Sequence, residues 1–169
     1  RWLECNPCTV EVGSSSLPGS TLKVYFGRPF FMHDIYNMRN LKPKVIYSDK
    51  FLNRVGLFFR IAGISLFPVV ILREYYLYTS PYWKKRKAKT VNHETIHFQQ
   101  QLEMLVIPFY ILYILEYLIK FFIFFDTKKA YYNISFEQEA FANDTNLDYL
   151  KTRKRFNWVK LIFKKSTHV

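Results

Sequence analysis

Hydrophobic and polar positions follow different patterns before and after residue 44. Residues 1–44 are poorly organised: residues 21–26 could form a short strand, and residues 12–20 read Val-Gly-Ser-Ser-Ser-Leu-Pro-Gly-Ser, which is typical of a linker. From residue 45 onward, apolar runs of strand or helix length recur. We therefore predict an N-terminal extension over 1–44, a folded domain over 45–152, and a tail over 153–169. In the tail, Lys and Arg alternate with large apolar residues, as in a basic amphipathic helix.

The first part of the folded domain predicts strands. Residues 45–47 (Val-Ile-Tyr) fit one short strand. Residues 61–72 form an uncharged run of 12 residues, too short for a transmembrane helix, which needs about 20. Because glycine, proline and β-branched residues are frequent here, we predict two strands, near 61–67 and 69–74. Pro68 cannot donate a ladder hydrogen bond and should mark a sheet edge or a bulge.

A longer apolar stretch covers residues 102–125. By length it could span a bilayer. It contains Pro108, which predicts a bend because proline removes a backbone donor and clashes with the preceding turn. Glu116 and Lys120 stand at the spacing of a helical ion pair. We expect one long helix here, bent near Pro108.

Residues 91–100 read Val-Asn-His-Glu-Thr-Ile-His-Phe-Gln-Gln and contain His-Glu-x-x-His. On a helix, His93 and His97 share one face and can hold a single Zn²⁺, and Glu94 can act as general base on a metal-activated water. A helical wheel separates the histidine side, with Gln100 and Met104, from an apolar side made of Val91, Phe98, Leu102 and Leu105. The alternative interpretation is an exposed helix with two incidental histidines.

A second polar helix is predicted from residue 135. Ser135 followed by Gln138 is a capping-box pattern, which places Glu137 in the first helical turn. Considered alone, Glu137 and Glu139 are ordinary first-turn acids that favour the helix dipole.

The composition indicates a folded and strongly basic protein. Of 169 residues, 50% are hydrophobic and 20% aromatic, which is ample for a core. Lys and Arg number 25 against 13 Asp and Glu, and the net charge of +12 favours acidic lipids, nucleic acid or acidic polypeptides as partners. Residues 84–89 concentrate this charge and fit a solvated loop and first helical turn, or a patch for anionic lipid or an acidic substrate. The sequence has no nucleic-acid-binding signature, so we do not expect that partner.

Cys5 and Cys8 are the only cysteines of the sequence. One Cys-x-x-Cys pair is half of a zinc knuckle, and no βαβ context supports a redox motif, so we expect incidental thiols and a reducing compartment. Residues 1–20 contain no apolar run of the kind that a secretory signal needs. The chain begins with Arg1, so we expect a fragment, with Met38 as a plausible internal start.

The two polar motifs together resemble the gluzincin metallopeptidases. The sequence His93-Glu94-x-x-His97-x-x-Gln100 is followed by Phe136-Glu137-x-Glu139-Ala140. This pair is most similar to the minimal, prodomain-free members and shares a helix pattern with the membrane-bound CAAX-processing type. Residues from about 45 to 160 also resemble a group of short, uncharacterised bacterial membrane-associated proteins. The resemblance implies a zincin-like α+β fold: a strand hairpin whose edge strand binds substrate, the metal-binding helix, a long apolar helix and a second ligand-bearing helix.

The resemblance also implies the ligands. In these families the second helix carries Glu-x-x-Ala-Asp, and its first Glu is the third zinc ligand. Here that residue is Glu137, which joins His93 and His97 and leaves a fourth position for water, as in catalytic sites. Glu139 would then support the site from behind or face solvent, and Phe141 stands where the family has Asp.

The implied function is a zinc metallopeptidase, which hydrolyses a peptide or protein substrate with Glu94 as general base. Tyr131, Tyr132 and Tyr149 are candidates for stabilising the oxyanion. Two alternatives remain open from the sequence. One is a zinc-binding scaffold without activity, and the other is a basic, aromatic module that binds a membrane surface or nucleic acid and carries the motif by chance.

The position of the apolar stretch constrains the membrane arrangement. Residues 102–125 lie between His97 and Glu137, so a single crossing would place these ligands on opposite sides of about 30 Å of hydrocarbon. We therefore expect a helix that does not cross as a lone span. The basic clusters favour association with a membrane surface, with the cytoplasmic face expected, and with binding that weakens at high salt.

Overall fold

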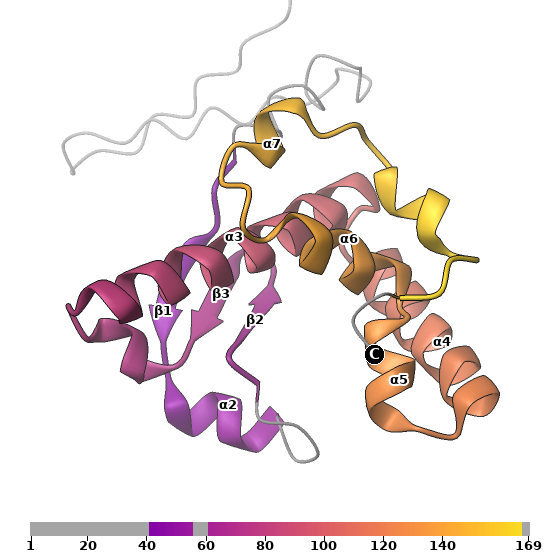
Figure 1. Ribbon diagram of the computed structural model, residues 1–169, viewed down its shortest axis with the longest axis horizontal. Coiled ribbons are helices and arrows are strands. Elements are labelled where there is room, and N and C mark those ends of the chain that lie inside the picture. Colours follow the sequence, from indigo (N-terminus) through magenta and orange to yellow (C-terminus); the bar gives the residue numbers. More distant parts are fainter. Residues whose placement is uncertain (1–40, 56–60, 167–169) are drawn as a thin grey trace, which may run out of the picture.

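The computed structural model describes residues 41–55 and 61–166, and these form an α+β fold, as the sequence predicts (Figure 1). Three short strands lie at one side and helices make up the rest. The elements in chain order are β1 (Lys44–Tyr47), α2 (Asp49–Val55), β2 (Gly63–Leu66), β3 (Val69–Leu72), the 3-10 helix η1 (Glu74–Leu77), α3 (Pro81–Glu103), α4 (Ile107–Phe124), α5 (Thr127–Tyr132), α6 (Ser135–Asn143), α7 (Tyr149–Thr152) and the 3-10 helix η2 (Asn157–Leu161).

The sheet has the order β1-β3-β2, with β1 parallel and β2 antiparallel to the central strand β3. The three strands predicted from the sequence are confirmed, with ends shifted by at most two residues. The interpretation of Pro68 is wrong: it lies in the tight turn between β2 and β3, after a cis peptide bond, where no ladder donor is needed. Helix α2 was not predicted.

Helix α3 is the centre of the fold, between the sheet on one side and α4 and α6 on the other (Figure 1). Ser80 caps it by accepting the backbone N–H of Trp83, and Pro81 opens its first turn. Residues 84–89 therefore belong to a helix and not to a loop. The wheel correctly places Phe98 in the core, but the histidine side is buried too, because α6 covers it; Leu105 lies beyond the helix and is exposed.

The apolar stretch is two helix segments separated by a sharp turn, so the prediction of one bent helix is wrong. Helix α3 ends at Glu103, Leu105 and Val106 adopt positive φ angles of 56° and 66°, and α4 begins at Ile107. Pro108 sits in the first turn of α4, where the missing N–H costs no helical hydrogen bond.

Helix α4 turns its few polar groups toward the rest of the protein. Glu116 accepts hydrogen bonds from the backbone N–H (2.9 Å) and hydroxyl (2.7 Å) of Ser135, and Lys120 donates to the carbonyl of Ile162 (2.7 Å). These contacts replace the ion pair expected between Glu116 and Lys120. They also replace the capping box, because Ile134 is the N-cap of α6 and the Ser135 hydroxyl is engaged with α4.

The C-terminal segment packs on α6 as a 3-10 helix, in place of the predicted amphipathic α-helix. Trp158 of η2 is buried, and its ring lies 4.3 Å from that of Phe136, in a cluster with Phe109 and Ile134. The tail therefore contributes Trp158 to the core of the domain. The predicted strand at residues 21–26, Met38, Cys5 and Cys8 lie outside the described residues.

Candidate metal centre

Two buried amides of α3 hold α6 against it. The Asn92 side chain donates to three carbonyls at the C-terminal end of α6 and just beyond, those of Asn143, Asp144 and Asn146, at 3.0 to 3.1 Å. About two helical turns further along α3, Gln100 donates to the carbonyl of Phe136 (3.3 Å) near the start of α6. Because α6 is fixed at both ends, its middle is held over the His93–His97 face of α3.

His93, His97 and Glu137 meet in this contact, all buried. The Nε2 atoms of the two imidazoles are 3.2 Å apart. The nearest carboxylate oxygen of Glu137 is 3.3 Å from Nε2 of His93 and 3.2 Å from Nε2 of His97. Ligands held at 2.0 to 2.1 Å from one tetrahedral metal ion are separated by about 3.3 Å. The three residues could therefore hold a metal ion with little movement.

The Glu137 carboxylate is only partly satisfied by protein donors. Its Oε1 accepts a hydrogen bond from the Tyr113 hydroxyl (2.7 Å), whereas its buried Oε2 has no hydrogen-bond partner within the described ranges and lies 3.3 Å from Nε2 of His93. A buried carboxylate oxygen without a donor is costly unless a cation meets it. Oε2 is therefore the atom of this cluster with the clearest need for a metal ion.

The pKa shifts in the cluster have the directions expected for groups that share a proton. Burial would raise the pKa of Glu137, but His97 and His93 hold it well below its usual range. Burial would lower the pKa of His97, but the Glu137 carboxylate outweighs this and raises it to about 9. The same negative field that binds a proton between these groups favours a metal ion in its place.

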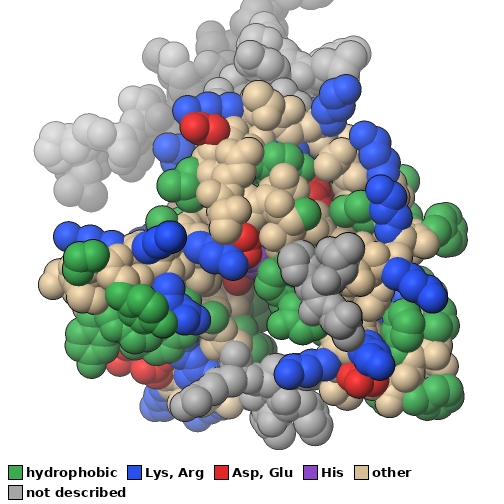
Figure 2. Space-filling view, in the orientation of Figure 1, with side chains coloured by type: hydrophobic (Ala, Val, Ile, Leu, Met, Phe, Trp, Pro, Cys, Tyr) green, Lys and Arg blue, Asp and Glu red, His purple; other side chains and the backbone are tan. Residues whose placement is uncertain are grey.

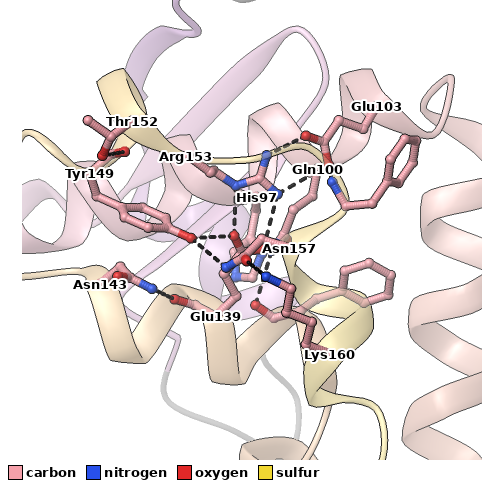
Figure 3. A network of polar contacts seen from close by, with 12 residues as sticks. His97, Gln100, Glu103, Glu139, Asn143, Tyr149, Thr152, Arg153, Asn157 and Lys160 are labelled. Carbon is pink, nitrogen blue, oxygen red and sulfur yellow. Dashed lines mark hydrogen bonds and ion pairs between the residues drawn. The ribbon is translucent and has the colours of Figure 1, made fainter.

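A polar network behind His97 fixes its orientation (Figure 3). Nδ1 of His97 lies 2.8 Å from Oε1 of Gln100, and Nε2 of Gln100 donates to Oε2 of Glu139 (2.8 Å). Arg153 in turn donates to both oxygens of Glu139, at 2.8 and 3.0 Å, and forms an ion pair with Glu103.

This network determines which nitrogen of His97 faces the candidate metal position. Arg153 holds Glu139 ionised, so the carboxylate can only accept, and the amide nitrogen of Gln100 must face it. The amide oxygen of Gln100 then faces His97, which must donate from Nδ1. Its Nε2 is left to bind a metal, which is the arrangement found for many metal-bound histidines.

Glu94 lies beside the three candidate ligands, against strand β2. It is buried, and burial raises the pKa of its carboxyl group, an effect that His93 and His97 only partly offset. Gly63 allows this close approach: a Cβ atom there would lie 3.3 Å from Cγ and Oε1 of Glu94, and only 2.6 Å from Leu72. Gln101 fixes the strand by donating to the Ser65 carbonyl (2.9 Å).

A cavity of about 750 Å³ opens over these residues. Strand β2 forms one wall and the aromatic inner side of α4 another, with Tyr131 and Tyr132 of α5 opposite. His93, Glu94, His97 and Glu137 all line it. The candidate metal position is thus buried by protein on the α3–α6 side and accessible from the cavity.

The remaining residues singled out in the sequence fall in different places. Tyr131 and Tyr132 line the cavity, whereas Tyr149 donates to Glu139 (2.7 Å) on the other side of α6, so it cannot reach a reacting group. Glu139 is buried behind Gln100 and does not face solvent. The ring of Phe141, at the family's Asp position, packs 4.6 Å from that of His93.

Sequence reasoning missed Tyr113 and Arg153. Tyr113 is hidden in an apolar stretch, although it shares a helical face with Glu116 and Tyr117, and that spacing could have marked an inward polar side. Arg153 is one of many basic residues in the tail, and no local pattern distinguishes it from its exposed neighbours.

A comparison with protein-family models gives no match, and comparisons with curated proteins and with solved structures give none either. The chemistry of the site is therefore the basis for any assignment of function.

Proposed function

We propose that this protein is a zinc-dependent peptidase with a zincin-like fold, in which His93, His97 and Glu137 hold the metal and Glu94 is the general base. The observation that carries the proposal is the position of Glu94. A structural metal site needs only its ligands, whereas here an additional buried carboxylate lines the same cavity as the three donors.

Zinc is proposed because two imidazoles and one carboxylate at near-tetrahedral separations suit it and leave one position open. When bound, Zn²⁺ supplies Lewis-acid activation of water and of the scissile carbonyl. The same donor set also suits Fe²⁺, so the identity of the metal is part of the test.

The residues of the chain supply the proton transfer and the positioning. Glu94 accepts a proton from the attacking water and passes it to the leaving amine, and its raised pKa brings the carboxyl group closer to neutrality, as this role requires. Tyr131 is the better candidate for the oxyanion donor. It lines the same cavity as Glu94 and Glu137, and burial, with both carboxylates nearby, raises the pKa of its hydroxyl well above the usual range.

Strand β2 is suited to bind the substrate. It is an edge strand, since β3 pairs with it on one side only, and residues 61–66 line the cavity beside Glu94. An extended peptide could add to such an edge through backbone hydrogen bonds, with the aromatic wall of α4 receiving apolar side chains.

Metal content and hydrolysis test the proposal together. Purified protein should contain about one zinc per chain, added zinc should raise its thermal stability, and His93→Ala or His97→Ala should abolish both effects. Glu94→Gln should keep the zinc and lose hydrolysis of a mixed peptide library. Zinc without any hydrolysis that depends on Glu94 would indicate a scaffold, and iron or no metal would contradict the proposal.

A further inference from the structure

Helix α4 has its polar and apolar sides reversed relative to a helix at a water-exposed surface. The residues that face the protein include the polar and charged ones, namely Tyr110, Tyr113, Glu116, Tyr117 and Lys120. The residues that face outward are all aliphatic or phenyl and are 40 to 66% exposed; they are Ile111, Leu112, Ile114, Leu115, Leu118, Ile119, Phe122 and Ile123.

The two sides divide the helix cleanly. At about 100° per residue, the outward positions cover roughly half of the circumference and contain no polar side chain. Leu105, Ile107 and Phe125 extend the exposed apolar surface beyond both ends. A face of this size is rare on a water-exposed surface and indicates a partner. Figure 2 shows hydrophobic side chains projecting along the margin where α4 lies, with Lys and Arg side chains beside them.

We infer that this outward face of α4 lies on, and dips into, an anionic lipid bilayer, with the helix parallel to the membrane plane. Among the described residues, α4 is the one helix that is long and apolar enough to cross a bilayer, and its 18 residues measure about 27 Å. Bilayer hydrocarbon accommodates an unbroken apolar strip of this length. Binding of this face to a membrane does not require a metal ion at His93 and His97.

The basic residues around the outward face of α4 favour an anionic lipid surface over a second copy of the chain as its partner. Lys128 and Lys129 follow the C-terminal end of α4 and are exposed. At the other end, the backbone N–H of Phe156 bonds to Glu103 beside the α3–α4 turn, which places exposed Lys154 there. Two copies packed face to face would bring these cations together in either relative orientation, whereas acidic head groups would attract them.

The surrounding elements favour a parallel helix over a crossing one. Lys120 is bonded to the Ile162 carbonyl, so the segment that carries exposed Lys160, Lys164 and Lys165 runs beside α4. If α4 crossed the bilayer, this basic segment would enter the hydrocarbon with it, and buried ammonium groups are costly there. With α4 parallel to the surface, only its apolar side enters the lipid.

Vesicle flotation of the full chain tests the surface. Wild type should float with vesicles of phosphatidylcholine and phosphatidylglycerol, and less with phosphatidylcholine alone or at high salt. The double variant Leu115→Gln/Ile119→Gln should bind about 100-fold more weakly, since two apolar side chains no longer enter lipid. The matched control Leu77→Gln/Leu147→Gln alters two exposed leucines elsewhere and should bind like wild type.

Two results would overturn the inference: wild type that stays monodisperse without detergent and does not float, or a wild-type dimer in solution that Leu115→Gln/Ile119→Gln dissociates. The second result would assign the face to another copy of the chain. All substituted positions are exposed, so thermal melting in detergent should show that each variant still folds.

The orientation is tested by depth. Single cysteines at Ile111, Leu115 and Phe122, introduced after Cys5→Ser and Cys8→Ser, can carry a fluorophore that lipid-bound bromine quenches. A helix parallel to the membrane places all three at the same shallow depth, since they share one line of the helix. Quenching that is deepest at Leu115 and shallow at the other two positions would instead show that α4 crosses.

Discussion

Glu137 and Glu139 stand two residues apart on α6, and both are almost completely buried, but their surroundings differ. Glu139 accepts hydrogen bonds from Gln100, Tyr149 and, through both oxygens, Arg153. Glu137 accepts one from Tyr113 and otherwise faces two imidazoles, which carry a positive charge only when protonated. Nearby cations hold the pKa of both carboxyl groups below the usual value, although burial opposes this.

The difference is the one expected if Glu137 is the proposed metal ligand and Glu139 is not. The lone pairs of Glu139 are used by fixed donors, so it binds its own chain and nothing else. Oε2 of Glu137 has no hydrogen-bond partner among the described residues and lies 3.3 Å from Nε2 of His93, and Glu137 lines a cavity. Glu139 thus contributes mainly to stability and Glu137 mainly to ion binding, and mutations should separate these contributions.

The largest effect should follow removal of the cation that serves Glu139. Arg153→Met keeps an unbranched apolar stem but leaves Glu103 and Glu139 buried without their counterion, and this should lower the free energy of unfolding by about 3–5 kcal/mol. Chemical denaturation of the metal-free protein measures it. Lys151→Met, which breaks an exposed pair with Asp148, is the control and should leave the midpoint unchanged. Equal midpoints for both variants would mean that the buried pair is not structural.

Glu137→Gln should reduce zinc affinity more than 100-fold, roughly 3 kcal/mol, because it removes a proposed ligand. Loss of a residue that only supports a ligand costs less, about 10- to 100-fold. Its metal-free stability should be close to that of wild type. Glu139→Gln should show the opposite behaviour: a clear loss of stability, with about one zinc per folded chain retained. Chelator competition gives the affinities. If Glu139→Gln loses the metal and Glu137→Gln keeps it, the assignment of ligands on α6 is reversed.

A smaller effect is expected at the residue that links the Glu139 network to His97. Gln100→Ala removes the acceptor for Nδ1 of His97, so the ring can rotate, and zinc affinity should fall by about 10- to 100-fold. The neighbouring Gln99→Ala is the matched control, since within residues 41–55 and 61–166 the Gln99 side chain donates to the Leu41 carbonyl at the surface and not to the site. An unchanged affinity in Gln100→Ala would show that ring orientation does not depend on this amide.

The smallest effect should come from Tyr113→Phe, which removes the hydrogen bond that the Tyr113 hydroxyl donates to Oε1 of Glu137. The carboxylate keeps its place but rotates more freely, so zinc affinity should fall about tenfold or less. Tyr117→Phe is the control, because it lines the same cavity one turn further along α4. A loss as large as that of Glu137→Gln would give Tyr113 a more direct part in the site.

The sequence alone indicates which residues form the candidate site, but it does not indicate the distant contacts that hold them in position. The spacing of His93 and His97 places them on one helical face whatever the fold, and the hairpin is marked by β-branched residues around Pro68. Such local signals can be recognised without knowing which other element the helix or strand packs against. The choice of Glu137 over Glu139 came from the family resemblance alone, since both residues are acids near the start of the same predicted helix.

What could not be predicted depends on contacts between distant positions. Arg153 meets Glu103 across 50 residues, and Glu116 meets Ser135 across 19, and neither pair has a local signature. The break at Leu105 was missed because Pro108 was interpreted as a bend within a helix, although proline fits the first turn of a new helix equally well. The 3-10 tail was missed because burial of Trp158 on Phe136 outweighs the amphipathic pattern.

The order in which translation delivers these groups has a consequence for maturation. The histidines of α3 leave the ribosome first, Glu137 follows 40 residues after His97, and Arg153 comes later still. At about 5–20 residues per second, a nascent chain exposes two unoriented imidazoles for several seconds before the third donor exists. A fragment that stops at residue 145 would contain every proposed ligand, yet it would lack Tyr149 and Arg153, whose hydrogen bonds fix Glu139 and, through Gln100, His97. Metal should therefore be captured tightly only after the chain beyond α7 has been made and folded back.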